Sequence, residues 1–281
     1  TFMRNDVHTV VTQQFDDIIL GTSHGKMDID PEYAALIVPT MVICKDFMDL
    51  FNAEALWMPG VSLLDGIAYD FGEKKNFIKS AHNFENDILV AARNIAKRYS
   101  TGKDHIKGTT DLALAIFDSM KKVHGMGDRE RLLLQIAVQL HDCGKYISMG
   151  DVAECSYQII MSTDIIGLSS LERQMIACAV RFNNSAFVYY DELYSMGIAI
   201  DRESYIKVVK MTAILRLANA MDRSHYQKVK GIKAVLKDRE LQMIVDSAQD
   251  ISLELGLLKD KEAFFEEVFG IRLVLRRKGR A

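Results

Sequence analysis

A histidine and an aspartate stand next to each other at His141 and Asp142, at the end of a strongly apolar run. Apolar residues at intervals of three and four through residues 132–140 predict a helix buried in a core, and Gly144 predicts the end of that helix. Neighbouring side chains on a helix point about 100° apart, so both can touch one ion only over the helix end. The pair therefore predicts either a metal site or a hydrogen-bonded core histidine beside a solvated aspartate.

Further candidate residues occur before and after this pair. His105 opens a second amphipathic segment, and Asn219 and Asp222 are three residues apart, so they share one face of a later helix. The order of His105, the His-Asp pair and a late aspartate resembles the pattern of the HD-domain superfamily. That superfamily comprises metal-dependent phosphohydrolases built wholly of helices, so the resemblance implies an HD-type all-helical domain.

Longer strings resemble one family in particular. From His105 to His225, "LLLQIAVQLHDCGKYIS" and "ILRLANAMDRSH" resemble the C-terminal HD-type domain of the exopolyphosphatase/guanosine pentaphosphate phosphatase (Ppx/GppA) family. Residues 30–70 resemble the end of that family's actin-like (ASKHA) phosphatase module. The resemblance implies hydrolysis of phosphoanhydride bonds in polyphosphate or guanosine pentaphosphate. In the family, this region shapes the substrate channel and often the dimer interface, while hydrolysis occurs in the N-terminal halves.

The chain departs from the family pattern at several positions where the family carries imidazoles or charged side chains. Those positions hold neutral or aliphatic residues: Val152, Ala153, Cys155, Asn183, Asn184 and Asn219. Such side chains bind divalent transition metals poorly compared with imidazole and carboxylate, which argues against a two-metal site.

A single divalent metal is the cofactor that the resemblance still implies. Its ligands would be His105, His141, Asp142 and either Asn219 or Asp222, with water completing an open coordination sphere. The alternative reading, which we favour from the sequence, is a buried hydrogen-bond cluster that fastens helices together.

Other residues near the pair also have two readings. Lys145 can contact a phosphate at the helix end, or be a solvated charge that suits the helix dipole, which we favour. Cys143 can be a nucleophile, but a small buried thiol is the commoner role. The helix start at residues 59–62 can hold an anion, although the chain has no Asp-x-Gly-x-Ser or Gly-Gly-Gly-Ser phosphate loop.

Composition limits the class of protein. The 281 residues are 49% hydrophobic and carry a net charge of −3, a balance typical of soluble globular domains and opposed to nucleic-acid binding through phosphate contacts. No apolar run reaches about 18 residues, so no membrane span is expected. The four cysteines have no paired short spacing, which fits reduced thiols in the cytoplasm. The chain begins with Thr1, which suggests a fragment of a longer protein.

The predicted fold is mainly α and has three parts. Residues 1–73 are expected to be the α/β end of an actin-like module, including a helix over 6–20. Residues 74–226 are expected to form the HD-type helical domain, and 227–281 a small β-β-α-β unit. In that unit, two alternating runs flank a turn at Asp238-Arg239.

These observations lead to one expected function and two alternatives. We expect the chain to be the C-terminal region of a Ppx/GppA-type phosphatase that acts on polyphosphate or a guanine nucleotide. This region would contribute to the substrate channel and to homodimer contacts, and it lacks the phosphatase loops. The first alternative is a free-standing metal-dependent HD phosphohydrolase. The second is a regulatory module that binds a guanine nucleotide. Neither nucleic acid nor membrane is an expected partner.

Overall fold

The computed structural model describes residues 2–3, 31–56, 62–79, 82–229 and 231–277. The chain divides into two compact units, Thr1–Ala81 and His82–Ala281. The helix predicted over 6–20 and most of the anion site considered at 59–62 lie outside the described residues. The predicted division into three parts stays a prediction.

The described residues of the first unit form two helices and a short strand pair. Helix α2 (Pro31–Leu50) continues through Pro39. Strands β1 (Phe2–Met3) and β2 (Ala55–Leu56) pair antiparallel.

Helix α3 (Leu63–Lys74) in the same unit begins with the predicted capping box. The backbone amide of Ser62 donates to Asp65 Oδ2 at 2.7 Å, and the Asp65 amide donates to Ser62 Oγ at 3.3 Å. Two amides that have no partner within the helix are thereby satisfied.

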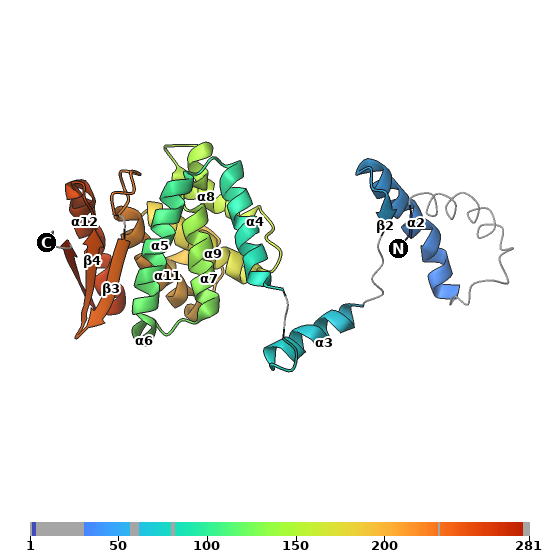
Figure 1. Ribbon diagram of the computed structural model, residues 1–281, viewed down its shortest axis with the longest axis horizontal. Coiled ribbons are helices and arrows are strands. Elements are labelled where there is room, and N and C mark those ends of the chain that lie inside the picture. The colour runs from blue at the N-terminus through green and yellow to red at the C-terminus, as the bar shows by residue number, and fades with distance from the viewer. Residues whose placement is uncertain (1, 4–30, 57–61, 80–81, 230, 278–281) are drawn as a thin grey trace. The chain divides into compact units, whose positions relative to one another are not determined.

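The second unit is a group of helices with a small sheet at its C-terminal end (Figure 1). Its helical elements are α4 (Phe84–Arg98), α5 (Lys103–Ser119), α6 (Lys121–His124), α7 (Asp128–Leu140), η1 (Cys143–Tyr146), α8 (Val152–Met161), α9 (Ser170–Asn184), α10 (Tyr190–Leu193), η2 (Tyr194–Met196) and α11 (Arg202–Ala220).

Helix α7 is the centre of this unit. Residues 132–134 and 136–140 are all buried, as their apolar pattern predicts, and the helix packs against α4, α5, α9 and α11. A helix that is covered on nearly every side holds its C-terminal end firmly in place. His141 and Asp142 follow that end directly.

Helix boundaries explain how the sequence positions these elements. A capping box of Ser169 and Glu172 starts α9. Gly127 is the N-cap of α7, and its amide donates to Glu130 Oε2 at 2.8 Å. Asp128 is the first helical residue, where its negative charge suits the helix dipole.

The C-terminal sheet has the predicted β-β-α-β order. Strands β3 (Gly231–Lys237) and β4 (Glu240–Asp246) form an antiparallel hairpin, and β5 (Arg272–Arg277) returns through α12 (Ser252–Phe269) to pair parallel with β4. Asp238 and Arg239 have φ of 54° and 72°, the left-handed conformations that a two-residue hairpin turn requires.

The described helices do not include one with the length and apolarity needed to cross a membrane.

Gly144 has a different role from the one its sequence position suggests. It lies inside the turn η1, and its Cα faces the start of α8. A Cβ there would lie 2.4 Å from Val152 O and 2.5 Å from the Ser156 amide nitrogen. Glycine is therefore required because two backbones approach closely, and not because a helix ends in the left-handed conformation.

Gly144→Ala is predicted to destabilise the fold, because the added methyl group meets backbone atoms that cannot rotate away. We expect a loss of about 2–3 kcal/mol in the free energy of unfolding, measured by urea denaturation. Gly150→Ala is the matched control, since the nearest atom to its Cβ would be Ser148 Oγ at 3.8 Å. Equal changes in the two variants would contradict this explanation.

Candidate functional site

Three helix ends bring the predicted residues together. His105 lies in the first turn of α5, His141 and Asp142 follow α7, and Asp222 lies just beyond α11. All four are buried, with exposures between 0% and 6%. The structure thus joins residues that are up to 117 positions apart in the sequence.

Hydrogen bonds fix the orientation of both imidazoles. His105 Nδ1 lies 2.7 Å from Asp222 Oδ2, and His141 Nδ1 lies 2.7 Å from the carbonyl oxygen of Val138. Carbonyl and carboxylate oxygens only accept hydrogen bonds, so each Nδ1 carries the hydrogen and donates it. In a neutral imidazole the lone pair then remains on Nε2.

The two Nε2 atoms face each other at 3.2 Å. Two nitrogen lone pairs at that distance repel unless a positive charge, a proton or a metal ion, lies between them. Asp142 adds a third acceptor: Oδ1 is 3.6 Å from His141 Nε2, and Oδ2 is 3.9 Å from His105 Nε2. The ligand atoms of these three residues lie within 4.8 Å of one another.

The buried surroundings determine which groups are charged. Burial lowers the pKa of His141 and outweighs the attraction of Asp142, so the neutral ring is favoured. Burial opposes ionisation of Asp142, but the ion pair with the Lys145 ammonium helps to outweigh it, and the pKa of that carboxyl is lowered. The candidate donor set is the two Nε2 atoms and one carboxylate, a combination that suits zinc and related divalent metals.

Asp222 and Asn219 occupy different places, although the sequence offers either as the fourth ligand. Asp222 holds the ring nitrogen of His105 that points away from His141. Burial opposes its ionisation, but hydrogen bonds from His105 and Gln227 lower the pKa of Asp222 overall. Asn219 lines a separate cavity with Arg216. Asp222 therefore orients His105 from behind.

Sequence reasoning missed two residues that complete this arrangement. The His225 ring stacks on the His105 ring, with centroids 3.7 Å apart and planes 12° apart. Gln227 donates to both oxygens of Asp222, from its amide at 2.8 Å and from Nε2 at 3.2 Å. Both residues lie after α11 with positive φ, where no periodic pattern exists to mark them. The only available signal is that the family-like string ends at His225.

Asn184 also contributes to the site from a position where the family carries a charged side chain. Its Nδ2 donates to the carbonyl oxygen of His141 at 3.0 Å. This bond ties the end of α9 to the turn that follows α7, so the amide has a structural partner in place of a ligand.

Lys145 and Cys143 are both placed beside the pair. The Lys145 ammonium lies 2.5 Å from Asp142 Oδ2, so it forms an ion pair and is not the freely solvated charge that the sequence favours. Cys143 is fully buried, and burial raises its pKa to about 11, which keeps the thiol protonated at neutral pH.

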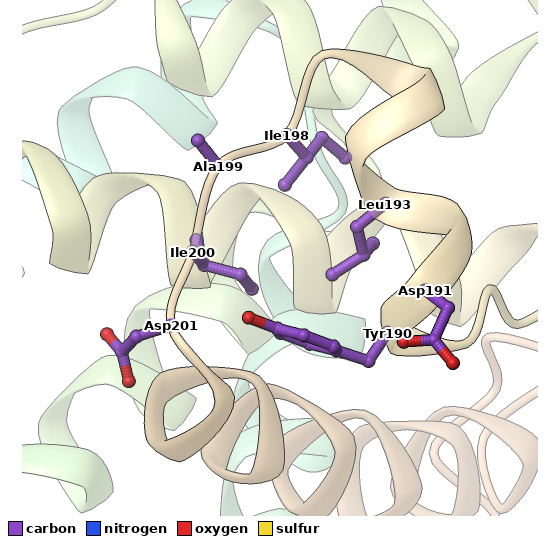
Figure 2. Close-up of a pocket in the computed structure, with 7 residues that line it drawn as sticks. All are labelled: Tyr190, Asp191, Leu193, Ile198, Ala199, Ile200 and Asp201. Carbon is purple, nitrogen blue, oxygen red and sulfur yellow. The ribbon is translucent and has the colours of Figure 1, made fainter.

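Two aromatic residues that precede α11, Phe187 and Tyr190, have different roles in the structure. Phe187 packs internally against Phe182 and Phe264. Tyr190 lines a cavity of about 600 Å³. Figure 2 shows Leu193 and Ile200 pointing into the space beside the Tyr190 ring. Phe187 therefore serves packing inside the fold, and Tyr190 borders a hollow that apolar side chains and the carboxylates of Asp191 and Asp201 line together.

Comparison with protein families agrees with this architecture. The family model described as Ppx/GppA phosphatase, domain III, matches residues 90–262. This chain belongs to the Ppx/GppA phosphatase family. The matched stretch contains His105, His141, Asp142 and Asp222, and a mainly helical fold followed by a small sheet is what the resemblance implies. No curated protein matches the sequence.

Asp222→Ala is predicted to destabilise this Ppx/GppA protein by about 3 kcal/mol, because it leaves the His105 Nδ1–H buried without a partner and removes the acceptor of the Gln227 amide. Urea denaturation measures the effect. Asp191→Ala is the control, since that side chain is 92% exposed. A loss no larger than that of the control would show that Asp222 does not anchor His105.

Proposed function

We propose that this chain is the C-terminal region of a Ppx/GppA phosphatase that hydrolyses phosphoanhydride bonds in polyphosphate or guanosine pentaphosphate. Within that phosphatase it guides the anionic substrate and pairs two subunits. The single observation that carries the proposal is the family match, which concerns domain III and covers residues 90–262. The sequence contains neither of the glycine-rich phosphate loops that would hold a phosphoryl group for attack. Bond cleavage is therefore assigned to residues outside this chain.

The purified chain is predicted to release no phosphate from polyphosphate or guanosine pentaphosphate above the rate of a protein-free blank. It lacks loops that place backbone N–H groups around a transferring phosphoryl group. A colorimetric phosphate assay tests this, and sedimentation equilibrium of the same sample should give twice the 31.8 kDa chain mass. Robust phosphate release without added metal, or a monomer at every concentration, would contradict the corresponding half of the proposal.

A second function, divalent metal binding at an HD-type centre, is favoured by one specific observation. Two nitrogens bound to one tetrahedral zinc lie roughly 3.3 Å apart, and the facing Nε2 atoms of His105 and His141 are 3.2 Å apart. Asp142 completes a set of three protein ligands, and Asp222 keeps His105 in the required tautomer. A bound metal would supply Lewis acidity toward a phosphoryl oxygen or a water.

The surroundings of that centre decide between catalysis and fastening. The three ligand residues are at most 6% exposed, the Lys145 ammonium occupies Asp142 Oδ2, and the His225 ring covers one face of His105. A phosphoester could reach the centre only if Lys145 or His225 moved. These contacts favour a centre that holds helices together over one that turns over substrate.

Isothermal titration with Zn²⁺ or Mn²⁺ is predicted to show one site per chain, which His141→Ala removes. Lys145→Met should tighten binding by about tenfold, because its ammonium no longer competes for Asp142. His82→Ala is the control, a histidine whose side chain is 58% exposed. No binding by the native chain, or unchanged binding by His141→Ala, would leave the cluster as a purely hydrogen-bonded fastening.

A further inference from the structure

A second polar cavity lies where the ends of α9 and α11 meet α12. Arg216, Asn219 and Arg223 recur along one side of α11 and the residues that follow it, and Lys261 comes from α12. Asn183, at the end of α9, closes the cavity, whose volume is about 240 Å³. None of the described residues that line it is a carboxylate.

Arg216 is held in place by neutral partners. Its Nε and Nη2 donate to the carbonyl oxygen of Phe182 at 2.9 and 2.5 Å, and Nη2 also donates to Ser185 O at 2.9 Å. The Phe264 ring centroid lies 4.6 Å from the guanidinium carbon. These contacts fix the guanidinium without neutralising it, so its positive charge acts on the cavity.

Lys261 is close enough to this charge to be affected by it. Burial and then the charge of Arg216 lower the pKa of Lys261, Arg223 adds to the effect, and Asp260 opposes it. Three like charges held near one cavity repel each other, and an anion bound among them would relieve that repulsion.

Asn183 adds a neutral amide to the wall of the cavity. The residue is 7% exposed. Its Nδ2 donates to Asn184 Oδ1 at 3.1 Å, and that contact sets the orientation of the amide. Asparagine therefore adds no negative charge that would offset the three cations.

We propose that this cavity binds a phosphate group, with its anionic oxygens toward Arg216, Arg223 and Lys261. Inorganic phosphate and a terminal phosphoryl group both carry the concentrated negative charge that three clustered cations attract. The volume is below the range of about 300–1,000 Å³ usual for drug-sized ligands, so it suits one phosphoryl group and not a nucleoside.

The cavity adds a specific binding site to the proposed function. The inference rests on that proposed function only for the source of the phosphate. The group could belong to the end of a polyphosphate chain or to a guanine nucleotide. Direct binding measurements on the full chain separate this proposal from the catalytic one, because they need no turnover.

Isothermal titration tests the site with inorganic phosphate, pyrophosphate, tripolyphosphate and guanosine diphosphate. We expect inorganic phosphate and tripolyphosphate to bind, and Lys261→Gln and Arg223→Gln each to weaken binding by about tenfold or more. Lys259→Gln, which removes an exposed charge from the same helix, should leave binding unchanged. Tighter binding of pyrophosphate and tripolyphosphate points to the polymer as source, and a clear preference for guanosine diphosphate over pyrophosphate points to the nucleotide.

Asn183→Asp tests the dependence of binding on the charge of the cavity. A negative charge at the cavity wall opposes a bound anion, so phosphate binding should be lost. Thermal denaturation of the same variant shows whether its fold is kept. No phosphate binding by the native chain overturns the proposal. Binding that survives Lys261→Gln, Arg223→Gln and Asn183→Asp overturns it equally.

Discussion

The structure of the larger unit depends on two buried hydrogen bonds that orient a facing pair of imidazoles, from His105 to Asp222 and from His141 to the Val138 carbonyl oxygen. Each acceptor fixes the tautomer of its ring: the Asp222 carboxylate puts the His105 hydrogen on Nδ1, and the Val138 carbonyl does the same for His141. The start of α5 and the ends of α7 and α11 are thereby joined through two side chains. Because the residues are buried, the loss of one partner would leave another polar group unsatisfied in a medium where that is costly.

The geometry that fastens the helices also creates the candidate metal centre. Once both hydrogens lie on Nδ1, both Nε2 lone pairs must face inward, where Asp142 adds a negative charge. The same arrangement can therefore serve as a structural cluster, with a proton between the two Nε2 atoms, or as a cation site, with a metal ion between them. Lys145 holds Asp142 in place from the other side and competes with any metal for its Oδ2.

The candidate phosphate cavity also lies at the ends of α9 and α11. Asn184 donates to the His141 carbonyl oxygen, while its neighbour Asn183 lines the cavity together with Arg216 and Lys261. The end of α9 thus touches both sites. Occupation of the cavity would order the Asn183–Asn184 pair and through it the turn that carries His141, which gives the two sites a physical connection.

Local features of the fold could be read from the sequence, and contacts between distant segments could not. The apolar run through 132–140, the capping boxes at Ser62 and Ser169 and the hairpin turn at Asp238 each depend on neighbouring residues. Gly144 was assigned the wrong role because the crowding comes from α8, which the local pattern does not reveal.

The site was predicted in composition but not in arrangement. The pattern of His105, His141, Asp142 and Asp222 identified the members of the cluster. Which ring nitrogen Asp222 contacts depends on how two helix ends meet, so its place behind His105 could not be foreseen. His225 and Gln227 were missed because they follow α11 in an irregular segment with positive φ.

Long-range ¹H–¹⁵N NMR of the histidine side chains tests the central claim most directly, because it reports which ring nitrogen carries the hydrogen. The account predicts that His105 and His141 both hold a hydrogen on Nδ1, in the metal-free protein and after metal is added. A neutral ring at either position with its hydrogen on Nε2 and a bare Nδ1 would contradict it.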